Sequence, residues 1–172
     1  VMHSYEAAQE VARQRSERFA AGRSFVTETV FSHPSKLELI DEAHRHGFRV
    51  DLQVVVVPVQ TSVSRVALRA QEGGHDVPED KIRGRHARAD GLLAQAIPKV
   101  ENARIWRNDG DERGSAPAGA RFDHQMVAEF KRGRIVERAT TPEWMPPHLD
   151  KLVKTTPMAD KSAPSKGSDH VP

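Results

Sequence analysis

A glycine pair followed by three arginines is the pattern in this sequence with the clearest chemical meaning. The stretch 73–88 opens with Gly73 and Gly74 and carries Arg83, Arg85 and Arg88. Arginine suits phosphate binding because its planar guanidinium donates two parallel hydrogen bonds to an anion. A hinge before an arginine-bearing helix is what a kinase lid requires, since the lid closes over a nucleotide and neutralises the transferring phosphoryl group. The alternative is a solvated basic helix whose arginines pair with nearby acidic residues.

A second polar group lies in residues 27–35, at the carboxyl end of a predicted strand. It contains Glu28, Thr29 and Ser32. In open α/β sheets, ligands bind beyond the carboxyl ends of the strands. A glutamate within an apolar strand costs free energy to bury unless it has partners, which makes Glu28 a candidate binding residue. The alternative is that Glu28 faces solvent on an edge strand.

The remaining polar residues favour no metal site. Asn108 follows a short predicted strand at 103–107, where asparagine commonly begins a turn. His44 and His46 are two residues apart and do not share a helix face, and no histidine spacing resembles a zinc site. The chain has no cysteine, which excludes disulfides, a thiol nucleophile and thiolate metal ligands.

The elements that must position these residues alternate between helices and strands. Helical spacing predicts helices over 4–21, 36–46, 61–70 and 79–97. Strand patterns cover 24–31, 48–57 and 103–107, and a β-hairpin is predicted over 125–130 and 134–137. The β-branched run at 54–57 predicts a strand buried on both faces, as in a parallel sheet covered by helices. Residues 24–57 then read as a right-handed βαβ unit, so the sequence predicts an α/β fold with three layers.

Composition limits the class of protein. With 172 residues, the chain is long enough for one domain. Its 26 Lys and Arg nearly balance 24 Asp and Glu, and no aromatic residues alternate with the arginines, which disfavours nucleic-acid binding. No apolar run approaches the ~20 residues that cross a bilayer and no secretory signal is evident, so we expect a soluble, cytoplasmic protein. Residues 150–172 are expected to form a disordered tail after a domain at 1–149.

Together these stretches resemble the zeta-toxin family of P-loop kinases. The resemblance extends over about residues 3–149 and is carried by SFVTETVFSHPSKLELI (24–40), GFRV (47–50) and GGHDVPEDKI (73–82). It implies a phosphotransferase that uses ATP or GTP with magnesium, acts on UDP-N-acetylglucosamine, and is restrained by a small helical antitoxin. It places Glu28, Thr29 and Ser32 at the substrate. It also assigns nucleotide contacts to His75, Arg83, Arg85, Arg88 and Asn108, with Arg83 and Arg85 as catalytic residues.

The sequence departs from the family pattern at the phosphate-binding loop. No stretch of the form G-x-x-x-x-G-K-[ST] occurs in the 172 residues, and the family's catalytic aspartate has no counterpart. His86 stands where relatives tend to have tyrosine. We therefore expect the sequence to begin downstream of that loop, the sheet to lack its first strand, and the chain to be inactive as a kinase. The alternative is a non-catalytic remnant or binding module that engages an antitoxin-like partner.

Overall fold

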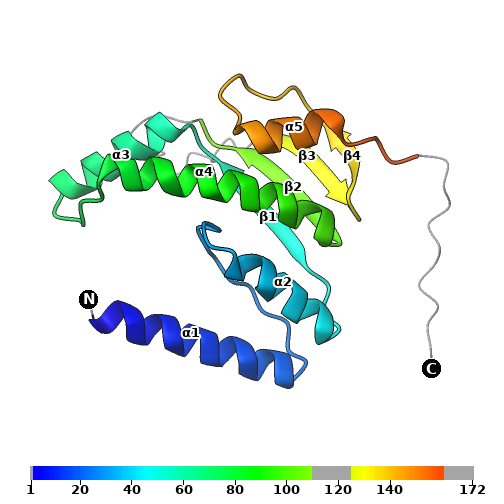
Figure 1. Ribbon diagram of the computed structural model, residues 1–172, viewed down its shortest axis with the longest axis horizontal. Helices are drawn as coiled ribbons and strands as arrows, with labels where there is room; N and C mark the ends of the chain where they lie inside the picture. Colours follow the sequence, from blue (N-terminus) through cyan, green and yellow to red (C-terminus); the bar gives the residue numbers. More distant parts are fainter. Residues whose placement is uncertain (1, 110–124, 161–172) are drawn as a thin grey trace, which may run out of the picture.

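The computed structural model describes residues 2–109 and 125–160 (Figure 1). In chain order its elements are α1 (Met2–Ala20), α2 (Ser35–Arg45), β1 (Asp51–Val56), α3 (Val59–Gln71), α4 (Glu79–Ala96), a 3₁₀ turn (Ile97–Lys99), β2 (Asn102–Arg107), β3 (Gln125–Lys131), β4 (Arg134–Arg138) and α5 (Pro147–Thr155). Every predicted helix and the predicted hairpin are confirmed. Within the described residues, no helix has the length and apolar character needed to cross a membrane.

A four-stranded open sheet with the order β1-β2-β3-β4 forms the centre of the fold. β1 and β2 run parallel, with α3 and α4 between them in the chain, and the strands from β2 to β4 are antiparallel. Arg132 and Gly133 join β3 to β4 with positive φ angles of 49° and 73°. Two such residues form the hairpin turn whose twist matches that of the strands. The α/β class predicted from the sequence is confirmed.

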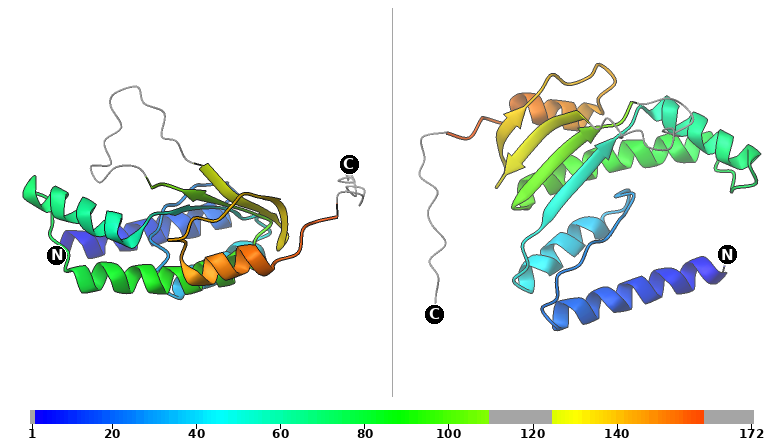
Figure 2. Two further views of the ribbon diagram at one scale, coloured as in Figure 1. Left: turned by 90° about the horizontal axis from the view of Figure 1, so that it is seen from above. Right: turned by 180° about the vertical axis from the view of Figure 1, so that it is seen from behind.

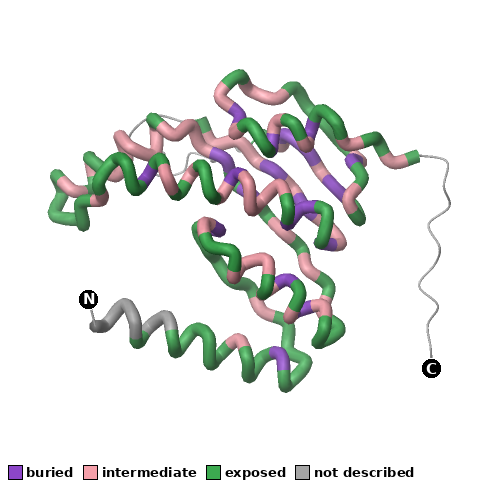
Figure 3. Tube along the Cα trace, in the orientation of Figure 1, coloured by how far each residue is buried: buried purple, intermediate pink, exposed green. Residues whose placement is uncertain are grey.

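The core lies between one face of this sheet and the helices α4 and α5. Figure 3 shows the buried residues gathered where these elements meet, and Figure 2 shows both helices on the same side of the sheet. The side chains with at most 1 % of their surface exposed include Ile97, Ala103, Ile105, Val127, Phe130, Ile135, Leu149 and Val153.

The opposite face of the sheet is not covered by any described helix. In β1, Val54 and Val56 are buried while Gln53 and Val55 are exposed, so the prediction that this strand is buried on both faces is wrong. Cross-strand polar pairs occupy the uncovered face instead: Trp106 Nε1 donates to Gln53 Oε1 (2.8 Å), and Arg104 donates to Glu129 Oε1 (2.7 and 3.0 Å). Such pairs are compatible with solvent, and in the described residues the second helical layer is absent.

The predicted strand at 24–31 is also wrong. The segment has no strand assignment and no ladder to β1, so the expected βαβ unit does not form. A cavity of about 390 Å³ lies between this segment, α2 and β1, and its walls include Phe25, Thr27 and Leu52. Val26 is fully exposed, whereas Phe31 is buried. Alternating side chains can favour a strand, but a strand also requires a neighbour at hydrogen-bonding distance.

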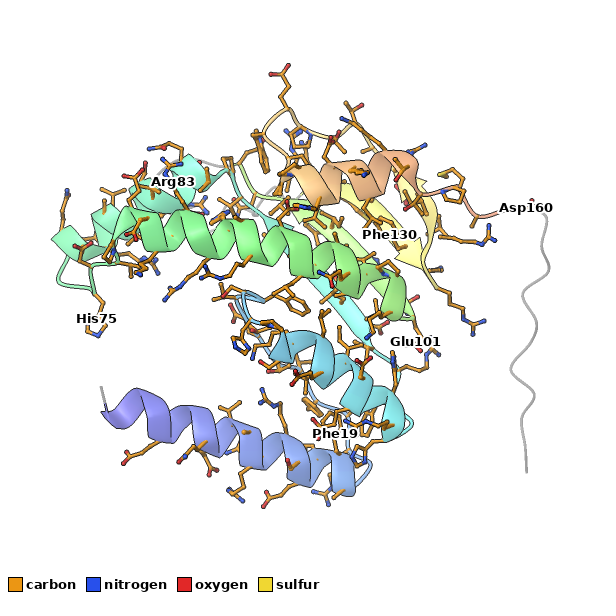
Figure 4. The ribbon with its side chains drawn as sticks, viewed as in Figure 1. Phe19, His75, Arg83, Glu101, Phe130 and Asp160 are labelled. Carbon is orange, nitrogen blue, oxygen red and sulfur yellow. The ribbon has the colours of Figure 1, made fainter. Side chains whose placement is uncertain are left out.

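The N-terminal helix is anchored through one residue near its end. Phe19 of α1 is 5 % exposed. Its ring lies 5.2 Å from Phe25, 5.2 Å from His46 and 5.3 Å from Phe48, measured between ring centroids. Figures 1 and 4 show the rest of α1 extending away from the sheet. Aromatic contacts of this geometry contribute about 0.5–1.5 kcal/mol each beyond area burial, so this cluster is the main attachment of α1.

The chain remains ordered well beyond residue 150. Leu149 and Val153 of α5 are fully buried in the core. After α5, Met158 forms a parallel bridge with Ile135, and the amide of Ala159 donates to the Ile135 carbonyl at 2.6 Å. The predicted disordered tail is therefore wrong for residues 150–160, because apolar side chains at helical spacing fix α5 to the sheet. Residues 161–172 lie outside the described part of the chain.

Candidate functional site

A pocket of about 250 Å³ opens beyond the carboxyl end of β1, and we call it the β1-end pocket. This is the edge of a parallel strand pair where ligands bind in open α/β sheets. The residues that line it are Thr29, Val30, Val55, Val56, Val57, Ser62, Arg85, His86, Ala89, Asp90, Leu93, Pro146 and Leu149. Five parts of the chain therefore meet there: the 29–30 segment, the end of β1, α3, α4 and the start of α5.

His86 and Ser62 form a polar contact across the wall of this pocket. His86 Nε2 of α4 lies 3.0 Å from Ser62 Oγ of α3. Burial lowers the pKa of His86 below its ordinary value of 6.5, because the charged ring loses water. The ring is therefore neutral at pH 7. A neutral imidazole can accept the serine proton or donate its own, depending on the tautomer.

Asp90 is the buried charged side chain of the site, with 4 % of its surface exposed. Its Oδ1 accepts a hydrogen bond from the amide of Leu149 (2.9 Å), and its Oδ2 accepts one from the amide of His148 (2.9 Å). The ring Nδ1 of His148 lies 2.8 Å from the same Oδ2. These amides belong to the first turn of α5, where N–H groups have no partner within the helix. Asp90 of α4 thus caps α5 from another element.

A second pocket of about 330 Å³, here called the Trp144-side pocket, shares His86 and Asp90 with the first. Arg83 and Trp144 also line it. Arg83 Nε donates to Glu79 Oε1 (2.7 Å) and its terminal nitrogen to Gln60 Oε1 (2.9 Å). Arg83 is therefore paired with an acidic residue of its own helix, which is the alternative given for it in the sequence analysis.

The structure brings some of the predicted site residues to the β1-end pocket. Thr29 and Arg85 line it on different walls. Arg88 and Ser32 are absent from its lining, but Arg88 Nε donates to the Ser32 carbonyl at 3.3 Å and ties the 24–32 segment to α4. Arg85 forms no hydrogen bond or ion pair with the described residues, so its charge is available to an anion.

Other predicted site residues do not line this pocket. Glu28 is exposed and is absent from its lining. Figure 4 shows His75 at the tip of the α3–α4 hairpin, far from the sheet. Asn108 follows β2, where its Oδ1 accepts a hydrogen bond from Arg65 at 3.3 Å. Asn108 nevertheless lies next to the pocket, because its amide donates to the carbonyl of the lining residue Val56 at 2.9 Å.

The glycine pair has a steric explanation in the turn from α3 to α4. Gly73 has a φ of +88°, and a Cβ on Gly74 would lie 2.7 Å from the carbonyl oxygen of Arg69. The amide of Gly74 donates to that same carbonyl at 2.8 Å. Only glycine fits this close approach, so the glycine pair is needed to end α3. This holds whether or not the turn between α3 and α4 also acts as a hinge.

The described residues offer an anion a charged partner. No group of three or more histidines and carboxylates that could hold a metal ion occurs in residues 2–109 and 125–160. Arg85, which is exposed and lines the β1-end pocket, carries a guanidinium group that suits phosphate oxygens. A phosphorylated ligand therefore matches the pocket.

The zeta toxin family model matches residues 3–112 of the 172. The chain belongs to the zeta toxin family. Membership indicates a kinase-like toxin domain. No curated protein and no solved structure matches the chain.

The residues matched by the family model form only part of the β1-end pocket. α3, α4 and β1 lie inside the matched range, whereas the hairpin and α5 lie beyond residue 112. Pro146 and Leu149 therefore supply a wall of the β1-end pocket from outside the matched range.

Sequence reasoning assigned no role to Ser62 or Asp90 and noted His86 only as a departure from the family. His86 and Asp90 are four residues apart on one helix, which places them on a shared face. That spacing could have indicated a polar site. The contact with Ser62 and the cap on α5 depend on tertiary packing and leave no local signal.

Proposed function

We propose that this zeta toxin family member binds a UDP-activated amino sugar, of the kind represented by UDP-N-acetylglucosamine, in its β1-end pocket as the acceptor for phosphoryl transfer. The position of Thr29 and Arg85 on different walls of one pocket at the carboxyl end of β1 is the observation that carries the proposal. The Thr29 hydroxyl can hydrogen-bond the sugar, and the Arg85 guanidinium can pair with the diphosphate.

The donor in this proposal is ATP or GTP, which supplies the phosphoryl group when bound. Arg85 and Arg88 are the described residues whose charge could stabilise it, and Arg83 could join them only by leaving Glu79. Glu28, His75 and Asn108 stay predictions as contacts, since none of them lines the pocket. Because the 172 residues contain no G-x-x-x-x-G-K-[ST] stretch, we expect a polypeptide of these residues alone to bind acceptor without transferring phosphate.

Isothermal titration calorimetry with UDP-N-acetylglucosamine tests the acceptor site. The Arg85→Ala variant is expected to weaken binding at least about tenfold, the effect of losing a charged hydrogen bond. Arg45→Ala is the matched control, because Arg45 is an exposed arginine of α2 outside the pocket. Equal affinity of wild type and Arg85→Ala would contradict the proposal.

Mass spectrometry of the sugar nucleotide after incubation with ATP and magnesium tests the expectation that these 172 residues alone transfer no phosphate. A phosphorylated product would contradict this expectation.

The family also implies a small helical antitoxin as partner, and the exposed valines Val26 and Val30 favour a partner on the 24–31 segment. Their side chains are 100 % and 65 % exposed, which is unusual for two apolar residues on one short segment. If a helical antitoxin binds there, the double variant Val26→Ser, Val30→Ser should release it in size-exclusion chromatography. Retention of the complex by the double variant would argue against this surface.

A further inference from the structure

α5 is held at both ends by charged side chains from other elements. At its N-terminus, Asp90 of α4 accepts hydrogen bonds from the amides of His148 and Leu149. At its C-terminus, Arg138 of β4 donates to the carbonyls of Val153 (2.8 Å) and Lys154 (3.4 Å). A helix carries partial positive charge at its N-terminus and partial negative charge at its C-terminus. Both contacts therefore have the favourable sign.

The Asp90 contact acts on the residue that lines the pocket. Leu149 donates its amide to Asp90 Oδ1, and its side chain forms a wall of the β1-end pocket. Pro146, which precedes α5, belongs to the same wall. Asp90 itself lines the pocket from the opposite element, α4. A change in the seating of α5 therefore changes the shape of the pocket directly.

We propose that Asp90 is a positioning residue that holds the N-terminus of α5 as a wall of the β1-end pocket, so that ligand binding in the pocket and the seating of α5 are coupled. The proposal makes α5, which lies outside the residues matched by the family model, a working part of the site. It rests on the proposed function only for the identity of the ligand.

Replacing Asp90 by asparagine tests this role with little change in shape. Asparagine keeps one acceptor oxygen but turns an NH₂ group toward the second backbone amide, leaving two donors face to face. The charge that opposes the positive end of α5 is also lost. Asp41→Asn is the matched control, because Asp41 pairs with Lys99 on the surface and removes the same charge far from α5.

Hydrogen exchange of the full chain gives the first readout. In Asp90→Asn, the amides of α5 are expected to exchange roughly tenfold faster or more, the scale of a lost hydrogen bond to a charged group. The amides of α2 should not change, and Asp41→Asn should leave α5 as in wild type. Unchanged α5 exchange in Asp90→Asn would overturn the proposal.

The pKa of His86 gives a second readout. A purely electrostatic role of Asp90 and a positioning role would change this pKa in opposite directions. The titratable side chains that share a pocket with His86 are Arg83, Arg85, Asp90 and His148, and its hydrogen-bond contact is Ser62. Losing the negative charge of Asp90 should lower the pKa of the ring, whereas opening the α5 wall should hydrate the ring and raise it. Burial is the cause of the lowered pKa of His86, so hydration of the ring is expected to outweigh the lost charge. The proposal therefore expects an NMR pH titration of Asp90→Asn to give a raised pKa for His86. A lowered or unchanged pKa would overturn it.

The variant Arg138→Gln keeps the proposal testable if Asp90→Asn does not fold. It leaves Asp90 intact and loosens the other end of α5, so faster exchange of α5 amides is expected, by a smaller factor than in Asp90→Asn. Wild-type exchange rates of the α5 amides in Arg138→Gln would contradict the claim that charged side chains hold both ends of α5.

Ligand addition completes the test of coupling and separates the two proposals. UDP-N-acetylglucosamine is expected to slow exchange of α5 amides in the wild-type chain in proportion to pocket occupancy. Binding without any change in α5 would overturn the coupling. If the sugar nucleotide does not bind, the proposed function fails, and the two ligand-free readouts decide the role of Asp90 without it.

Discussion

α1 and α5 sit at opposite sides of this molecule and are attached in contrasting ways. α1 has 19 residues and is held near its C-terminus by the ring of Phe19. α5 has 9 residues, yet two of its side chains are fully buried and both of its ends are capped by charged groups. The comparison teaches that a helix is fixed by its tertiary contacts and not by its length.

The largest effect is expected from Leu149→Ala in α5. Deleting a fully buried leucine removes transfer free energy and leaves a cavity, at a cost of about 2–5 kcal/mol. Urea denaturation followed by circular dichroism measures this change. Val11→Ala in α1 is the control, because Val11 is 47 % exposed and its loss should change stability by less than about 0.5 kcal/mol. Similar losses of stability in the two variants would contradict the claim that tertiary contacts fix α5 more firmly than α1.

Phe19→Ala should have a smaller and more local effect. Removing the ring abolishes the contacts with Phe25, His46 and Phe48, so α1 is expected to separate while the sheet stays folded. Limited trypsin digestion should then cleave within α1 several-fold faster than in wild type, with unchanged cleavage of α5. Phe19→Leu, which keeps an apolar side chain, should be intermediate. Global unfolding of Phe19→Ala would show that α1 is part of the core.

A pH dependence of stability should arise on the α5 side from His86. Its pKa is lowered in the folded state, so the unfolded chain binds a proton more readily and stability falls as the pH drops below about 6.5. The carboxylates with lowered pKa values, Glu10, Glu101 and Asp150, titrate in a more acidic range. Urea midpoints measured between pH 7.5 and about 5.5 cover the range in which histidines titrate, and the His86→Gln variant assigns the part that is due to His86. His86→Gln should reduce the slope, and an unchanged slope would contradict the assigned cause.

The smallest effect is expected on the uncovered face of the sheet. Gln53→Ala removes the acceptor for Trp106 Nε1, a cross-strand pair worth about 0.2–1 kcal/mol. The indole nitrogen can then hydrogen-bond water, because the face is open. Urea denaturation measures the change, with tryptophan fluorescence reporting on the indole. A loss as large as that of Leu149→Ala would mean that this face is buried in solution.

The sequence predicted most of the fold, because its elements carry strong local patterns. Helical spacing and glycine stops gave α1 to α4, and the Lys131–Arg134 turn gave the hairpin. The β-branched run of β1 suggested two buried faces, but sheet coverage depends on distant elements, and Gln53 was the local sign of an exposed face. The 24–31 segment has a strand pattern without a neighbouring ladder, which no local pattern reveals.

The site was predicted less completely than the fold. Thr29 and Arg85 both line one pocket, although Thr29 was predicted from a strand over 24–31 that does not form and Arg85 from the arginine-bearing helix. Asp90 was missed because its function is to cap a helix that is 58 residues away from it in sequence. α5 itself was missed because its short apolar pattern lies in a proline-rich stretch next to a polar tail.

An NMR titration of the isotope-labelled chain with UDP-N-acetylglucosamine tests the proposed acceptor site most directly. Saturable shifts are expected for Thr29, Arg85, His86 and Leu149, which line the β1-end pocket, with much smaller shifts for α1 and for His75 at the tip of the α3–α4 hairpin. Shifts confined to the hairpin tip or α1, or no saturable shift at all, would contradict the claim that the β1-end pocket is the acceptor site.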